Sequence, residues 1–121
     1  MNTAIIVAAG SGLRFGSQPK QFTSLLGKPL IVHTLEQFES CPAIDEIILV
    51  LSEDGRERFE QIKDQFEISN LKSVITGGRT RAESVKSGLD HIAGKDEDIV
   101  VIHDGARPFI SVDEITQTVE K

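Results

Sequence analysis

A glycine-rich loop carrying two cationic side chains follows the first apolar run of the sequence. The run covers residues 4–9, and the loop covers residues 10–21, with Arg14 and Lys20 set among its glycines. Because glycine has no side chain, backbone N–H groups in such a loop approach an anion closely, and the cations add charge where phosphates would sit. The loop therefore predicts nucleotide chemistry at the end of a strand.

This loop matches neither of two common nucleotide-binding fingerprints. Counting from Gly10, the sixth position of a P-loop falls on Phe15, and no Gly-Lys-Ser or Gly-Lys-Thr follows. The glycines at 10, 12 and 16 do not open directly into a helix, as they would in a dinucleotide site. A long loop of this kind before Pro29 instead suggests a lid or clamp over a nucleotide.

A second motif, at residues 77–85, is a glycine pair between a strand and a helix. Backbone N–H groups exposed at Gly77 and Gly78 are suited to bind an anion or the edge of a base. The alternative interpretation is structural, a tight turn followed by a helix cap at Thr80 or Ser84.

A third motif, at residues 103–108, places an acid at the end of an apolar strand. Asp104 stands beside a glycine there and is suited to hold Mg²⁺, which takes one or two carboxylates together with substrate phosphates. In the alternative interpretation Asp104 caps a turn or pairs with Arg107. His103 either orients Asp104 or packs at the end of the strand.

The charge of the 121-residue chain is acidic overall and unevenly distributed. Its formal net charge is −6, but all 19 acids lie at Glu36 or later, while the first 35 residues carry only cations. An acidic protein with a local positive patch suits a small polyanion better than a nucleic acid. A chance gap in the placement of the acids is the alternative.

Cysteine content and hydropathy indicate a cytoplasmic protein. The lone Cys41 excludes an intramolecular disulfide and argues against a cysteine-built metal site, so we expect a buried thiol. No apolar run is long enough to cross a membrane, and the first residues lack the charge pattern of a signal peptide.

Apolar runs alternate with amphipathic stretches along the whole chain, which predicts an α/β fold with a mostly parallel sheet and helices on both faces. All three motifs then fall at the carboxyl ends of strands, where ligands bind in such sheets. We expect strands over residues 3–9, 45–51, 71–76 and 97–103, and helices from Pro29 and over residues 54–67, 80–92 and 112–120.

The order and spacing of the three motifs resemble the 2-C-methyl-D-erythritol 4-phosphate cytidylyltransferase family. The resemblance rests on residues 8–14 and 19–21, then 77–85, then 103–108. It implies a Rossmann-like fold of the nucleotide-diphospho-sugar transferase type, in which residues 1–121 form the nucleotide-binding portion of a single cytidylyltransferase domain. Because family members run well beyond Lys121, we expect a domain truncated at its C-terminus. A small complete domain is the alternative.

The resemblance also implies an activity, the transfer of CMP from CTP to 2-C-methyl-D-erythritol 4-phosphate with release of pyrophosphate. Three alternatives stay open at this point. A ribitol-5-phosphate cytidylyltransferase shares the first loop, a sugar-1-phosphate nucleotidyltransferase would use another nucleotide, and the chain alone would be a non-catalytic CTP-binding fragment.

Roles for individual residues follow from the same resemblance. It implies Mg²⁺ as the cofactor, CTP and a small polyol phosphate as partners, and a homodimer for the intact enzyme. The implied catalytic residues are Arg14 and Lys20, the nucleotide-binding residues are Ala8, Ala9, Gly10, Ser11, Gly12, Gly78 and Ser84, the metal ligand is Asp104, and Arg81 and Arg107 are substrate-binding or structural.

Overall fold

A parallel four-stranded sheet, in the order β7-β6-β1-β8, forms the centre of the structure. Its strands are β1 (Asn2–Ala8), β6 (Glu46–Leu51), β7 (Leu71–Thr76) and β8 (Ile99–Asp104). The computed structural model describes residues 2–8, 14–15, 18–19, 24–25, 28–66, 68–78, 80–92, 99–104 and 114–117.

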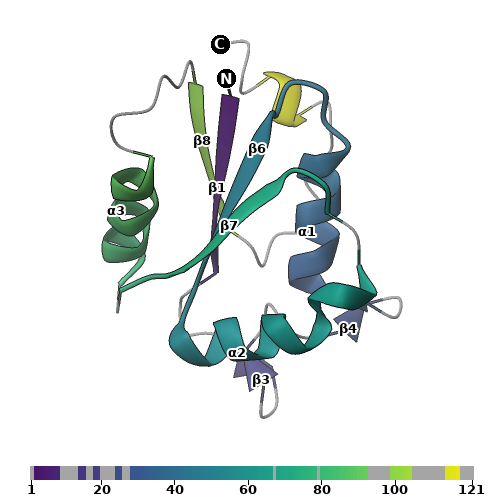
Figure 1. Cartoon of the computed structure of the whole chain (residues 1–121), viewed down its shortest axis with the longest axis vertical. Helices are drawn as coiled ribbons and strands as arrows, with labels where there is room; N and C mark the ends of the chain where they lie inside the picture. Colours follow the sequence, from purple (N-terminus) through teal and green to yellow (C-terminus); the bar gives the residue numbers. More distant parts are fainter. Residues whose placement is uncertain are drawn as a thin grey trace.

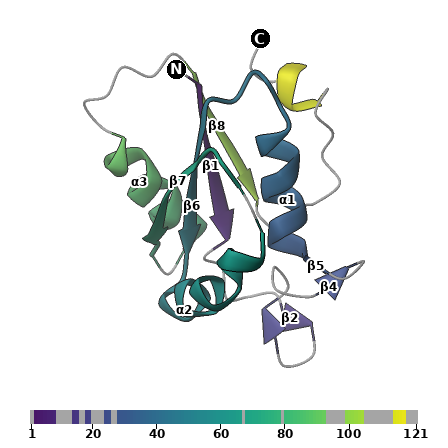
Figure 2. The same cartoon turned by 45° about the vertical axis from the view of Figure 1, so that its right-hand side comes forward.

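Helices cover both faces of this sheet, as the sequence predicts. On one face lie α1 (Leu30–Glu39) and α2 (Glu53–Ile62), the latter continued by a 3-10 turn at Lys63–Gln65, and on the other lies α3 (Arg81–His91). Figures 1 and 2 show α1 and α3 on opposite sides of the strands. No helix within the described ranges is long and apolar enough to cross a membrane.

Burial on both faces explains why the central strands are almost continuously apolar. In β1, Ala4 and Ile6 join the cluster beneath α1, whereas Ile5 and Val7 join the cluster beneath α3. Side chains alternate between the two faces of a strand, so a strand covered on both sides needs an apolar residue at every position. Strand β6 follows the same pattern.

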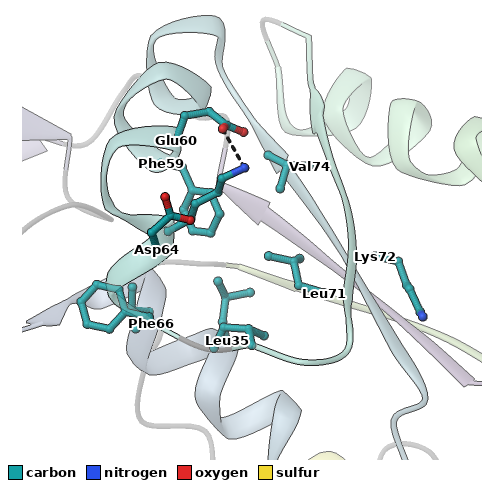
Figure 3. Close-up of a pocket in the computed structure, with 11 residues that line it drawn as sticks. Leu35, Phe59, Glu60, Asp64, Phe66, Leu71, Lys72 and Val74 are labelled. Carbon is teal, nitrogen blue, oxygen red and sulfur yellow. Dashed lines mark ion pairs between the residues drawn. The ribbon is translucent and has the colours of Figure 1, made fainter.

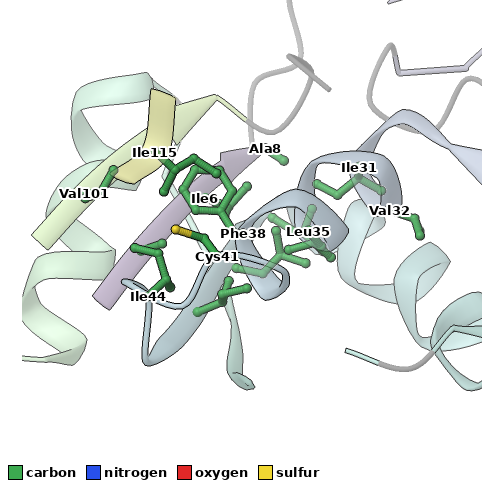
Figure 4. Close-up of a cluster of buried hydrophobic side chains, with 14 of the residues drawn as sticks. Ile6, Ala8, Ile31, Val32, Leu35, Phe38, Cys41, Ile44, Val101 and Ile115 are labelled. Carbon is green, nitrogen blue, oxygen red and sulfur yellow. The ribbon is translucent and has the colours of Figure 1, made fainter. Parts of the chain in front are cut away.

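Helix α1 begins where the sequence predicts. Pro29 precedes its first residue with a φ of −59°, the value to which the pyrrolidine ring restricts the backbone. Ile31, Leu35 and Phe38 then recur at helical spacing and bury one face of α1 against the sheet. Figure 4 shows Phe38 beside Ile6 between α1 and β1, with Leu35 and Ile31 farther along the helix.

The structure also shows how His103 and Cys41 pack. The ring of His103 lies 5.2 Å from that of Phe38, centroid to centroid and at 53°, so His103 packs at the end of its strand. Cys41 is a buried thiol, as expected, with its sulfur 3.4 Å from Thr116 Oγ1.

Several predicted elements differ from the structure in their bounds, most by a single residue. The helix predicted over 54–67 ends earlier, because the chain tightens into the 3-10 turn and Phe66 is extended, with a φ of −134° and a ψ of 135°. This extended backbone lets Phe66 pack against the core beneath α1. The strand predicted over 97–103 runs to Asp104. Of the helix predicted over 112–120, residues 114–117 are described and are helical.

The segment predicted as one long loop before Pro29 contains two short antiparallel pairs. Strand β2 (Arg14–Phe15) pairs with β3 (Gln18–Pro19), and β4 (Ser24–Leu25) pairs with β5 (Lys28–Pro29). Two-residue strands are too short to produce a detectable alternation of apolar and polar residues, so the sequence pattern did not reveal them.

Replacing Phe38 by alanine tests how much the layer between α1 and the sheet stabilises the fold. Phe38 is fully buried, so Phe38→Ala should lower the free energy of unfolding by about 3–5 kcal/mol, measured by urea denaturation. Leu89→Ala is the control, because Leu89 is 41% exposed. Equal losses in the two variants would contradict this account of the core.

Candidate functional site

The carboxyl ends of all four sheet strands lie at one edge of the sheet. Ala8 at the end of β1 pairs with Leu51 of β6, Leu51 pairs with Thr76 of β7, and Asp104 of β8 pairs with Val7 of β1. This edge brings the ends of the strands in register, and ligands of open α/β sheets bind beyond such an edge.

A tight glycine turn continues this edge beyond β7. The Gly77 N–H donates to the Leu51 carbonyl oxygen at 2.8 Å, which keeps the turn beside β6. A Cβ atom at Gly77 would lie 2.5 Å from Ser84 Oγ and 2.7 Å from Val50 Cγ1. One at Gly78 would overlap Glu83 Cβ. Glycine is therefore required here because the backbone lies directly against α3.

The first turn of α3 is capped by Thr80. Its hydroxyl oxygen accepts from the Glu83 N–H at 3.1 Å, and its hydroxyl lies 3.4 Å from Glu83 Oε1, to which it donates. This is a variant of the capping box, and the spacing of Thr80 and Glu83 carries that signature in the sequence. The structural interpretation of the motif is confirmed for Thr80, and the sequence reasoning missed Glu83.

Ser84 is not a cap but reaches back to the glycine turn. It is 1% exposed, and its Oγ donates to the Gly78 carbonyl oxygen at 3.5 Å. The structure therefore brings together two of the residues implied for nucleotide binding, Gly78 and Ser84, at the N-terminus of a helix. Partial positive charge on the N–H groups there favours anions and hydrogen-bond acceptors.

A further cation at this edge, Arg56, was not predicted from the sequence. Ser52 caps α2 by accepting from the Gly55 N–H at 3.0 Å, which places Arg56 in the first turns of that helix. Arg56 Nη1 then donates to Thr76 Oγ1 at 3.0 Å, next to the glycine turn. The contact joins residues 20 positions apart, and no local pattern predicts it.

The structure describes some of the other implied site residues in full, some by their backbone only, and some not at all. Ala8 is buried at the end of β1, and Arg81 is the exposed first residue of α3. Arg14 in β2 and Asp104 in β8 are placed by their backbone alone. The remaining predictions fall on residues outside the described ranges: Ala9, Gly10, Ser11, Gly12, Lys20 and Arg107.

The side chains at this edge can be compared with those that a Mg²⁺ ion would need. The described residues contain no group of three or more His, Cys, Asp or Glu side chains arranged to hold a metal ion. Asp104, at the end of β8, is the acid that the predicted motif offers. One carboxylate fits a cation such as Mg²⁺, whose other ligands are waters and substrate phosphates.

A hollow of about 390 Å³ lies elsewhere, between α1, α2 and β7 (Figure 3). Its rim carries Glu60, Lys63 and Asp64, and Lys63 Nζ lies 2.8 Å from Glu60 Oε2. The hydrogen bond and charge of Glu60, aided by Asp64, raise the pKa of Lys63 above its usual value. None of the implied site residues lines this hollow, and ligands of open α/β sheets bind beyond the carboxyl ends of the strands, so that edge of the sheet is the better candidate.

Fold and strand register together define a doubly wound α/β protein whose candidate binding site lies beyond the carboxyl ends of its parallel strands. A glycine turn at a capped helix N-terminus is typical of nucleotide-binding members of this class. The chain belongs to the 2-C-methyl-D-erythritol 4-phosphate cytidylyltransferase (IspD) family, whose model matches residues 2–121. This confirms the family and the fold expected from the sequence.

Relatives in both sequence and structure agree with this assignment. The Clostridium tetani 2-C-methyl-D-erythritol 4-phosphate cytidylyltransferase is 48% identical over 120 residues, covering 98% of this chain and 48% of the relative. The Geobacillus kaustophilus protein of the same name is 44% identical over 117 residues, covering 96% and 50%.

The crystal structure of 4-diphosphocytidyl-2C-methyl-D-erythritol synthase from Anaerococcus prevotii superposes with a TM-score of 0.80 at 33% identity. The match covers 98% of this chain and 49% of that one. The chain thus spans about half the length of the curated relatives it matches.

The cap of α3 supports a prediction about stability. Thr80→Ala removes both bonds to Glu83 and should lower the free energy of unfolding by about 1 kcal/mol, measured by urea denaturation. Thr80→Ser keeps a hydroxyl at the cap and should retain most of that stability. If alanine and serine are equivalent at this position, the cap does not stabilise α3.

Proposed function

We propose that this chain is the nucleotide-binding part of an enzyme that transfers CMP from CTP to 2-C-methyl-D-erythritol 4-phosphate and releases pyrophosphate. The observation that carries the proposal is the corner formed by Gly78 and Ser84 at the capped start of α3. Family membership over residues 2–121 supports the choice of reaction.

In this proposal the base binds against the corner. Small residues at positions 8 and 78 leave backbone groups within reach of a flat ring. The buried Ser84 hydroxyl would turn from the Gly78 carbonyl oxygen to the edge of the base. Its bond to the Gly78 carbonyl oxygen is 3.5 Å long, at the outer limit for a hydrogen bond. Exchanging this weak contact for a shorter one with cytosine would therefore cost little.

The triphosphate is neutralised by the hairpin of β2 and β3. Arg14 pairs with Pro19 across this hairpin, and Lys20 follows Pro19 directly in the sequence. In this proposal both cations act on the triphosphate. A phosphate oxygen of the acceptor attacks the α-phosphorus of CTP, a new P–O bond forms, and the bond to the leaving pyrophosphate breaks. Such transfer depends on positioning and on charge neutralisation more than on covalent catalysis.

Asp104 is the residue proposed to hold Mg²⁺. When bound, the ion would neutralise charge on the phosphates of CTP. A cytoplasmic setting and a homodimer of the full-length protein belong to the same proposal. The buried thiol of Cys41 and the absence of any other cysteine in the sequence support a reducing compartment.

Pyrophosphate release tests the proposed reaction. We would assay CTP and Mg²⁺ with 2-C-methyl-D-erythritol 4-phosphate, using this chain and a version extended to the length of its relatives. Activity of the extended version with this acceptor is the expected result, and ribitol 5-phosphate serves as the control acceptor. Preference for ribitol 5-phosphate, or no pyrophosphate with either acceptor, would refute the proposal.

A substitution of Lys20 tests directly whether this cation contributes to the reaction. Lys20→Ala in the extended version should lower kcat by about 10²–10³-fold, because it removes a cation that stabilises transition-state charge. Lys28→Ala is the matched control, since Lys28 is another cation of the acid-free first 35 residues. Near-parental turnover of Lys20→Ala would remove Lys20 from the mechanism.

A further inference from the structure

Helix α3 lies unusually close to the sheet at Gly88. A Cβ atom at this position would lie 2.7 Å from Ile5 Cγ2 and 3.2 Å from Ile5 Cδ1, and 3.5 Å from Val50 Cγ2. Contacts under about 3.0 Å are far inside van der Waals separation, so the helix is as near to β1 as a glycine permits.

The residue one helical turn earlier, Ser84, depends on this close approach. Ser84 and Gly88 are the buried residues of α3, four positions apart and so on one face of the helix. Val50 lies against both the glycine turn and the helix, because its two methyl groups face the Cβ positions of Gly77 and Gly88. The distance of α3 from the sheet at Gly88 therefore also sets the distance of Ser84 from the glycine turn.

The Ser84 contact with the turn has little tolerance for displacement. Its bond to the Gly78 carbonyl oxygen is already 3.5 Å long, so a shift of the helix away from the sheet breaks it. Ile5 cannot move away instead, because it is fully buried in the central strand β1, which is paired on both sides. A side chain at position 88 must therefore move the helix.

We infer that Gly88 is a positioning residue for the nucleotide corner. By seating α3 on Ile5, it places the Ser84 hydroxyl and the capped helix N-terminus where a base and its phosphates would bind. This inference rests on the proposed function, and it assigns to Gly88 an effect on CTP affinity exerted through Ser84, without contact between Gly88 and the nucleotide.

Calorimetric titration of CTP into this chain and its Gly88→Ala variant tests the inference. Alanine is a better helix former than glycine, so α3 should persist in the far-ultraviolet circular dichroism spectrum. The CTP dissociation constant should rise by about tenfold, the effect of losing one hydrogen bond to the base. Ser87→Ala, a neighbouring change that adds no atom against the sheet, should bind CTP as the parent does.

A second-site change separates positioning from general destabilisation. Ile5→Ala removes both atoms that alanine at position 88 would meet, so the double variant should bind CTP with the affinity of Ile5→Ala alone. A folded Gly88→Ala variant with parental affinity overturns the inference. If Gly88→Ala does not fold, recovery of folding and affinity in the double variant supports the inference, and failure to recover overturns it.

The amide resonances of Gly77, Gly78 and Ser84 distinguish this inference from the proposed function. If the parent chain does not bind CTP, the proposed function of the chain fails. Amide shifts that move in Gly88→Ala and return in the double variant would then still support the seating of α3. Unchanged shifts in Gly88→Ala would overturn it.

Discussion

The burial of β1 on both faces is the constraint on which the rest of the structure depends. Ile5 and Ile6 of this strand point to opposite sides and are both fully buried, one beneath α3 and the other beneath α1. Because the strand is apolar on both faces from Ala4 to Ala8, it cannot lie at an exposed surface, and flanking strands and helices on both faces must cover it. Parallel pairing with β6 and β8 then brings the strand ends to one edge.

The candidate site follows from that arrangement of layers. A helix approaches an apolar sheet only as closely as the residues of its buried face permit, and in α3 these are Ser84 and Gly88. The same approach presses the backbone of the turn at Gly77 and Gly78 against the start of the helix. The same contacts thus determine both the packing of the core and the geometry of the site. A Cβ atom added at Gly77, Gly78 or Gly88 would overlap neighbouring atoms.

Elements with strong periodicity were predictable from the sequence, and those set by a few contacts were not. The central strands and α1 agree with prediction because each buries a long apolar pattern. The predicted end of α2 was wrong, because the backbone is extended at Phe66, which packs against the core, although the helical pattern of the sequence continues there. In the candidate site, Gly78 and Ser84 were found from their motif, whereas Arg56 was missed because its partner Thr76 is remote in sequence.

The sequence by itself determined the alternation of strands and helices, the apolar strands of the sheet, and the motifs by which the family is known. These properties are local, because they depend on residue type and spacing within single segments. Only the tertiary structure decided that Ser84 bonds to the glycine turn while Thr80 caps the helix, and that Gly88 rests on Ile5. The approach of Gly88 to Ile5 joins segments remote along the chain. The choice between Thr80 and Ser84 as the cap depends on how α3 packs on the sheet, which the spacing of these residues alone does not decide.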